Sequence, residues 1–181
     1  MDIKQTTLSG LLLINLDVLP DNRGSFREAW QSAKMEPLGL PHFTPVQHNI
    51  SESTYGVTRG VHAESWDKYL HVVYGTAFVA IVDLRQKSAT FGQYATFQMD
   101  HSNALFVPKG FGNSYQATSG LTVYSYLVDG LWSPEKRYVS VALDDQDLNI
   151  PWPIPKNQQI ISEKDRQNQS LRQAFPQMFR K

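Results

Sequence analysis

The sequence predicts an all-β fold, a sandwich or barrel built from many short strands. Apolar and β-branched runs recur along most of the chain, and polar turn signals separate them. Closely spaced strands of this kind favour a sandwich or barrel over alternating strands and helices. The expected strands are residues 10–18, 69–73, 76–84, 91–99, 103–107, 114–117, 121–128 and 138–141.

Each expected strand ends at residues that favour turns, chiefly Gly, Pro, Asn, Asp and Ser. Residues 76–84 stand apart because they are apolar almost without interruption, as expected of a strand that is buried on both faces or crosses between two sheets. The separating turns are Asp21-Asn22-Arg23-Gly24, Tyr74-Gly75, 85–88, 100–102, Pro108-Lys109-Gly110 and Ser119-Gly120.

Helical signals are few and lie toward the two ends of the chain. Residues 26–35 could form one short helix before the break at Pro37-Leu38-Gly39. Residues 162–175 predict another, with Ser162 as N-cap and Asp165 three residues later. The prolines of residues 151–155 indicate an extended connector into a C-terminal tail, about 151–181. We expect a single domain that spans residues 1–181.

Composition excludes several classes of protein. The chain has 181 residues and no cysteine, so disulfides, zinc–thiolate sites and thiol catalysis are excluded. Seventeen basic and 17 acidic residues give a net charge of +0, which argues against binding duplex nucleic acid. The apolar run at residues 11–16 is too short to cross a membrane, and no signal peptide is evident. A cytoplasmic protein is therefore expected.

Polar side chains lie on several of the expected strands. Alternation places Gln47 and Asn49 on one face, and it places Arg59 on the face opposite to His62. A small barrel can hold one ligand among inward-facing side chains. His62, Tyr126 and Asp165 also have purely structural interpretations. An isolated His is often structural, and a Tyr on a strand is usually packed in the core. An Asp at the start of a helix is usually solvated.

Ordered motifs along the chain resemble those of the dTDP-4-dehydrorhamnose 3,5-epimerase family. The resemblance runs from about Gly10 to Leu171 and covers nearly the whole chain. Several motifs in order, at compatible spacing, make it more specific than any one motif. They are Asp21-Asn22-Arg23-Gly24-Ser25-Phe26-Arg27-Glu28, Gln47-x-Asn49-x-Ser51, Arg59-Gly60-Val61-His62, Val82-Asp83-Leu84-Arg85, Ser88-Ala89-Thr90-Phe91-Gly92, Val107-Pro108-Lys109-Gly110-Phe111, Trp152-Pro153 and Ser162-Glu163-Lys164-Asp165.

The resemblance implies a cupin-type double-sheet barrel, or jelly roll, that forms a homodimer in which the N-terminal region of one subunit contacts ligand in the other. It implies that His62 is the general base, that Asp165 pairs with it, that Tyr126 is the general acid and that Lys68 lies near the keto oxygen of the substrate. The residues expected to bind substrate are Arg23, Phe26, Glu28, Gln47, Asn49, Arg59, Asn113 and Trp132.

The reaction implied by the resemblance is epimerisation of dTDP-4-dehydro-6-deoxy-D-glucose at C3 and C5, giving dTDP-4-dehydro-L-rhamnose for dTDP-L-rhamnose biosynthesis. No redox cofactor is expected, because the substrate already carries the ketone. No metal is expected, because His62 is followed by Ala63 and Glu64 instead of a second His ligand.

Two alternatives stay open. The neighbourhood of Leu131 and Trp132, the short stretch between His62 and Lys68, and Asn113 at a position where many members carry His depart from the family pattern. These departures are compatible with an enzyme that epimerises one carbon only, C3 or C5. The other alternative is a non-catalytic or metal-dependent cupin.

Overall fold

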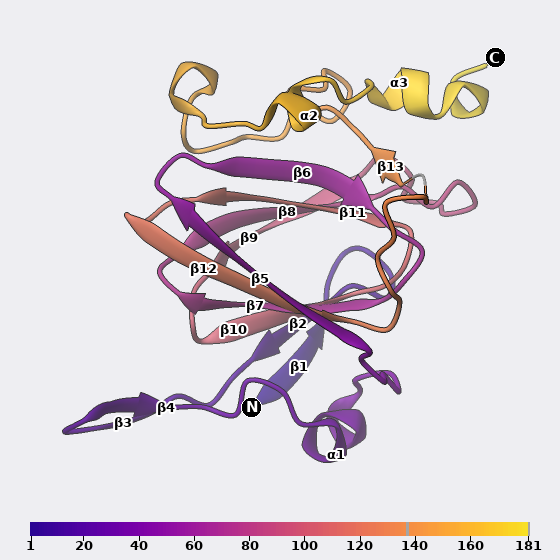
Figure 1. Ribbon diagram of the computed structural model, residues 1–181. Helices are drawn as coiled ribbons and strands as arrows, with labels where there is room; N and C mark the ends of the chain where they lie inside the picture. Colours follow the sequence, from indigo (N-terminus) through magenta and orange to yellow (C-terminus); the bar gives the residue numbers. More distant parts are fainter. Residues whose placement is uncertain (137, 181) are drawn as a thin grey trace.

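The computed structural model describes residues 1–136 and 138–180 and shows two antiparallel β-sheets packed face to face (Figure 1). This arrangement confirms the predicted all-β double-sheet barrel. The first sheet has the order β1 (Asp2–Gln5), β2 (Leu12–Asn15), β10 (Asn103–Val107), β7 (Lys68–Tyr74), β12 (Leu121–Val128) and β5 (Gln47–Thr54). The second has the order β13 (Val139–Ser140), β6 (Thr58–Ala63), β11 (Phe111–Ala117), β8 (Ala77–Asp83) and β9 (Tyr94–Met99).

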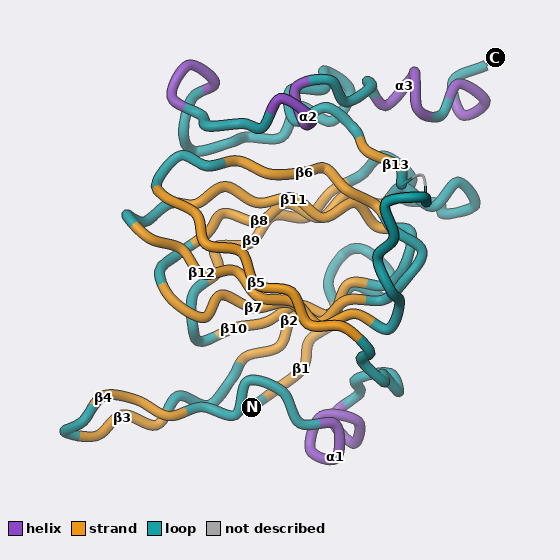
Figure 2. Tube along the Cα trace, viewed as in Figure 1, coloured by secondary structure: helices purple, strands orange, loops and turns teal. Residues whose placement is uncertain are grey.

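Short elements at the two ends of the chain flank the barrel, and a separate hairpin extends away from it (Figure 2). No helix in the described ranges is long and apolar enough to cross a membrane. The hairpin consists of β3 (Leu19–Asp21) and β4 (Gly24–Phe26). The helical elements are α1 (Ser32–Met35), η1 (Glu36–Leu38), η2 (Lys156–Gln158), α2 (Glu163–Arg166), α3 (Leu171–Ala174) and η3 (Pro176–Met178).

The expected helix at residues 26–35 was wrong for most of its length. Only Ser32–Met35 is α-helical, because Gly24–Phe26 is extended and pairs with Leu19–Asp21 across a tight turn. The expected position of the break is confirmed, since Gly39 ends η1 with a φ of +105°, a conformation that glycine adopts at little cost.

The expected helix at residues 162–175 is divided into two short helices, α2 and α3. Ser162 caps α2 as predicted, accepting a hydrogen bond from the backbone N–H of Asp165 at 3.1 Å. The helix ends there because the next residues make tertiary contacts instead of helical hydrogen bonds. The Asn168 side chain donates to the Gly60 carbonyl, and Gln169 forms a β-bridge with Val141. Ser170 starts α3 with its own capping box.

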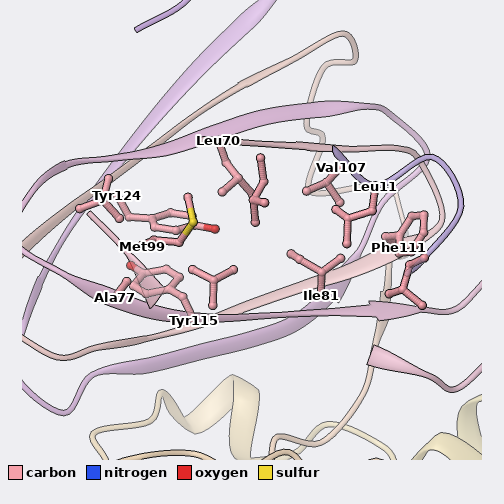
Figure 3. Close-up of a cluster of buried hydrophobic side chains, with 13 residues drawn as sticks. Leu11, Leu70, Ala77, Ile81, Met99, Val107, Phe111, Tyr115 and Tyr124 are labelled. Carbon is pink, nitrogen blue, oxygen red and sulfur yellow. The ribbon is translucent and has the colours of Figure 1, made fainter. Parts of the chain in front are cut away.

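The main core lies between the two sheets (Figure 3), where Leu70, Ile81, Tyr115 and Tyr124 are among the buried side chains. Strand β8 is buried along its whole length, which confirms the interpretation of residues 76–84. Its alternate residues face different cores. Ala77, Val79 and Ile81 pack between the sheets, and Phe78, Ala80 and Val82 pack against the C-terminal segment.

The ends of the chain cover the outer faces of the two sheets. Met35 and Phe43 pack with Leu12 and Ile14 on the outside of the first sheet. Leu171 and Phe175 pack with Val82 and other residues on the outside of the second sheet. The chain just after α2 is fixed to β6, because Asn168 donates a hydrogen bond to the Gly60 carbonyl, and α2 therefore lies beside the site described below.

A buried carboxylate, Asp83, organises the turn after β8. It accepts hydrogen bonds from Arg85 at 2.7 and 2.9 Å, and from the hydroxyls of Ser88 and Thr90 at 2.6 Å each. Burial acts to raise the pKa of Asp83, but these hydrogen bonds outweigh it and lower the pKa to about 2.

Replacement of Asp83 by Asn should destabilise the fold in a pH-dependent way. The folded pKa lies below the value of about 3.9 in unfolded chains, so the stabilisation is complete above about pH 4 and is lost as the pH falls toward 2. We expect a loss of roughly 1–2 kcal/mol at neutral pH, because Arg85 stays partly solvated. Thermal melts of the wild type and the variant between pH 7 and pH 2 measure this difference in stability. A difference that stays constant across this pH range would contradict the prediction.

Candidate active site

A cavity of about 300 Å³ opens between the two sheets and gathers polar side chains from both of them and from α2. It brings together five of the predicted site residues, which lie far apart in the sequence. The lining residues are Ser51, Arg59, His62, Asn113, Tyr115, Tyr124, Tyr126, Ser162, Lys164 and Asp165.

His62 on β6 and Asp165 on α2 form a hydrogen-bonded pair in this cavity. The His62 Nε2 atom lies 2.7 Å from Asp165 Oδ1, and the His62 side chain keeps 36% of its surface exposed while Asp165 is buried. Burial acts to raise the pKa of Asp165, but the hydrogen bond and the charge of His62 outweigh it, so the pKa lies below its ordinary value. Asp165 is therefore an anion at neutral pH and can support a positive charge on the imidazole.

Tyr126 on β12 supplies a phenol to the same cavity. Its side chain is half-buried, and Asn49 on β5 is its direct neighbour across the sheet. Burial raises the pKa of Tyr126, and the negative charge of Glu64 raises it further. The phenol therefore keeps its proton at neutral and moderately alkaline pH, as a proton donor must.

Arg59 lines the same cavity as His62, and this corrects the prediction that the two residues point to opposite faces. Asn113 of β11 faces His62 and Tyr115 faces Arg59, so two residues of β6 lie opposite one residue of β11. Such a bulge reverses the alternation of side chains along a strand. Gly60 permits the close approach, since a Cβ there would lie 2.7 Å from the Cα of Ser114.

Lys68 begins β7, and its side chain is 5% exposed. Its Nζ atom is hydrogen-bonded to Glu64, and the same Nζ lies 6.0 Å from the ring centroid of Tyr126. Among the described residues, Lys68 does not itself line the cavity, but it lies next to Tyr126, which does. Its predicted role beside a substrate oxygen stays a prediction.

Gln47 and Asn49 lie on one face of β5, as alternation predicted. The Gln47 side-chain amide donates to Asn49 Oδ1 at 2.7 Å, and the side-chain oxygen Oε1 of Gln47 accepts from the backbone N–H of Trp132 at 3.1 Å. This bond connects β5 to the loop after β12. The Trp132 side chain itself is 54% exposed.

Asn113 on β11 lines the cavity, and a neighbouring lining residue fixes its side chain. Its Oδ1 atom accepts a hydrogen bond from the Tyr124 hydroxyl at 3.0 Å. Because Asn113 faces His62 across the strand pair, this amide lies next to the expected base. Its predicted contact with substrate stays a prediction.

Arg23, Phe26 and Glu28 are not brought to the cavity of their own chain. Arg23 lies in the turn of the β3–β4 hairpin, where its guanidinium is 2.5 Å from Asp21, and Phe26 is 63% exposed at the end of the hairpin. Glu28 is hydrogen-bonded to Lys34. Their role in binding substrate stays a prediction that needs a second subunit.

Several lining residues were missed by the sequence analysis. Tyr115 stacks on Tyr124 with ring centroids 4.1 Å apart, and its hydroxyl lies 2.9 Å from the hydroxyls of Ser51 and Ser53. The two-residue spacing from Gln47 and Asn49 to Ser51 could have revealed Ser51 and Ser53. No local signal marked Lys164 as a cation that faces the cavity, because only the packing of α2 places it there.

The arrangement is suited to moving protons. An imidazole backed by a carboxylate can remove a proton from carbon, and a phenol in the same cavity can return one. In residues 1–136 and 138–180, no three His, Asp or Glu side chains are grouped so as to hold a metal ion.

Comparison with known proteins gives a consistent result. A family model described as dTDP-4-dehydrorhamnose 3,5-epimerase matches residues 5–173. A protein from Streptococcus pyogenes serotype M6 named RmlC homolog is 40% identical over 152 residues, covering 80% of this chain and 77% of that protein. The dTDP-4-dehydrorhamnose 3,5-epimerase of Methanothermobacter thermautotrophicus is 35% identical over 176 residues, covering 93% and 94%. The structure of RmlC from Streptococcus suis in complex with dTDP-D-xylose matches with a TM-score of 0.91 and 36% identity, covering 96% of this chain and 92% of that chain.

Proposed function

The chain belongs to the dTDP-4-dehydrorhamnose 3,5-epimerase family, and on this premise we propose that it is an isomerase that epimerises C3 and C5 of dTDP-4-dehydro-6-deoxy-D-glucose. The product is dTDP-4-dehydro-L-rhamnose. The observation that carries this proposal is the single cavity that both the His62–Asp165 pair and the phenol of Tyr126 line.

The proton to be removed is acidic because the C4 ketone lies next to both C3 and C5. Loss of either proton gives an enolate, in which the negative charge is shared with the C4 oxygen. His62 takes the proton as general base. Asp165 fixes the orientation of the imidazole and stabilises the imidazolium that forms, as the carboxylate of a Ser-His-Asp triad does.

The return proton must reach the opposite face of the same carbon for its configuration to invert. Tyr126 delivers it, since its phenol stays protonated at neutral pH. The ammonium of Lys68 stabilises the charge that develops on the C4 oxygen. Arg59 and Lys164, which line the same cavity, are suited to binding the diphosphate.

Exchange in D2O tests this function directly. Incubation of the protein with dTDP-4-dehydro-6-deoxy-D-glucose in D2O should place deuterium at both C3 and C5 of the product, as measured by NMR or mass spectrometry. Deuterium at one carbon only would identify a 3- or 5-epimerase. Binding of dTDP without exchange at either carbon would reject the enzymatic function.

A homodimer is part of the proposal, and three features of the chain support it. A two-stranded hairpin is marginally stable in water, yet β3–β4 extends from the barrel (Figure 1). Ile50 and Val73 are 59% and 39% exposed on the outer face of the sheet. Within the described ranges, His71 Nδ1 and Arg27 Nε are buried without a hydrogen-bond partner, as expected of atoms that a second subunit completes.

Such a dimer places Arg23 and Phe26 of one subunit in the cavity of the other. Arg23 can then grip the diphosphate, and the ring of Phe26 can stack on the thymine base. The cytoplasmic location expected from the sequence also remains part of the proposal, because a charged nucleotide sugar does not cross a lipid bilayer unaided.

Mixing two inactive variants should restore activity if each site is shared between subunits. We expect Arg23→Ala and His62→Ala to be inactive or nearly so alone. Unfolding and refolding them together should recover up to about a quarter of wild-type activity, because half of the dimers would contain one intact site. Sedimentation of each sample checks the oligomeric state. A monomer in solution, or no recovery in dimers that have mixed, would reject the shared site.

A further inference from the structure

Lys68 is an ammonium ion that the fold has removed from water. Only 5% of its side-chain surface is exposed. Burial of an unpaired charge is costly, so a buried lysine needs a counter-charge and a hydrogen-bond acceptor. Glu64, four residues earlier, supplies both, and it is the one hydrogen-bond acceptor for Nζ among residues 1–136 and 138–180.

The backbone holds both members of this pair in place. The Glu64 carbonyl accepts a hydrogen bond from the N–H of Gly110 at 3.2 Å. Between them, Asp67 accepts from the Lys109 N–H at 2.8 Å and donates its own N–H to Asp129 at 2.8 Å. Lys68 then enters β7, where it pairs with strands on both sides. The loop can therefore hold the Glu64 carboxylate in one position.

Glu64 is connected to both expected proton-transfer residues, to His62 through the sequence and to Tyr126 through its charge. It follows β6 two residues after His62. Its charge is felt at the phenol of Tyr126, where it favours the protonated form. The ammonium that Glu64 binds lies 6.0 Å from the centroid of the same ring. Glu64, Lys68 and Tyr126 thus form one electrostatic unit at the edge of the cavity.

Resting on the proposed function, we propose that Glu64 is a positioning residue that keeps the Lys68 ammonium aimed toward Tyr126, where the C4 oxygen of the substrate acquires negative charge. Glu64 itself need not touch the substrate. A neutral side chain at this position would leave a buried ammonium without its counter-charge, and the lysine would turn away from its present position. The carboxylate therefore matters for the transition state more than for binding of the nucleotide.

The test compares kcat with nucleotide binding in Glu64→Gln. We expect kcat for epimerisation to fall about tenfold, which is less than the roughly 100-fold cost of deleting an oxyanion donor outright. The Kd for dTDP should stay within about twofold of wild type, because the nucleotide lies away from the C4 oxygen. Glu64→Asp, which keeps the charge, should restore most of the activity. Glu36→Gln, at an exposed position in η1, is the matched control.

A double variant shows whether Glu64 acts through Lys68. On a Lys68→Met background, Glu64→Gln should cause no further loss of kcat, because the ammonium that it positions is gone. Should Glu64→Gln fail to fold, the comparisons of Glu64→Asp with wild type and of the double variant with Lys68→Met decide in its place.

Three results would overturn the assignment: wild-type kcat in Glu64→Gln, an equal loss of dTDP affinity and kcat, or a full additional loss on the Lys68→Met background. Failure of the proposed function is distinguishable, because the wild-type protein would then show no exchange in D2O. An active wild type with an unaffected Glu64→Gln variant rejects only the role of Glu64.

Discussion

Replacement of His62 by Ala should abolish deuterium exchange at C3 and C5 while binding of dTDP survives. The variant removes the proposed general base, and general-base catalysis contributes about 10²–10⁴-fold. We expect a loss at the upper end of this range, because no other imidazole lines the cavity in the described part of the chain. Exchange is followed by NMR in D2O, and dTDP binding by calorimetry.

His42→Ala is the matched control for this variant. His42 is exposed and pairs with Glu36, away from the cavity, so its loss should leave exchange unchanged. If His62→Ala still exchanged deuterium at the wild-type rate, the role of base would belong to another group. Loss of dTDP binding together with exchange would instead indicate that the cavity had collapsed.

Replacement of Tyr126 by Phe should separate proton removal from inversion. The enolate would still form, because His62 and Asp165 are intact. Without the phenol, the enolate would regain a proton mainly from the side of His62, so the original configuration would return. We expect epimerised product to fall about a hundredfold or more, with deuterium still entering recovered substrate.

The measurement is the ratio of deuterium in recovered substrate to deuterium in epimerised product. That ratio should rise strongly in Tyr126→Phe. It should stay at the wild-type value in the control Tyr94→Phe, because Tyr94 lies on β9 and its hydroxyl donates to the Asn149 carbonyl, outside the cavity. An unchanged ratio in Tyr126→Phe would mean that another group returns the proton.

Much of the fold could be predicted because its strands follow a local period. The apolar run at 76–84 became β8, buried on both faces, and the run at 121–128 became β12 with the bounds that were expected. Predictions of helices were weaker. Residues 24–26 pair with residues 19–21 in a hairpin. Residues 168 and 169 bond to Gly60 and Val141, so these partners, distant in the sequence, overrode the local preference for helix.

The candidate site was predictable only in part. Motifs selected His62, Tyr126 and Asp165, and the structure places all three at one cavity. The prediction that Arg59 points away from the face of His62 was wrong, because a two-residue period assumes a regular strand. The bulge opposite Ser114 breaks that period. The network of Tyr115, Ser51 and Ser53 was missed, because Tyr115 on β11 meets the two serines of β5 only in the folded barrel.

The sequence by itself determined the fold class, the residue types needed for proton transfer and the family, since periodicity and ordered motifs are local properties of the chain. The pairing of Asp165 with His62 was expected from the motifs, but only the tertiary structure decided how the two meet across 103 residues. It also decided that Arg59 turns into the cavity and that the hairpin of Arg23 turns away from it. The physical reason is that each of these depends on how separate segments pack. Packing of the C-terminal segment against the second sheet, with Leu171 and Phe175 buried and Asn168 hydrogen-bonded to Gly60, carries that carboxylate to its imidazole.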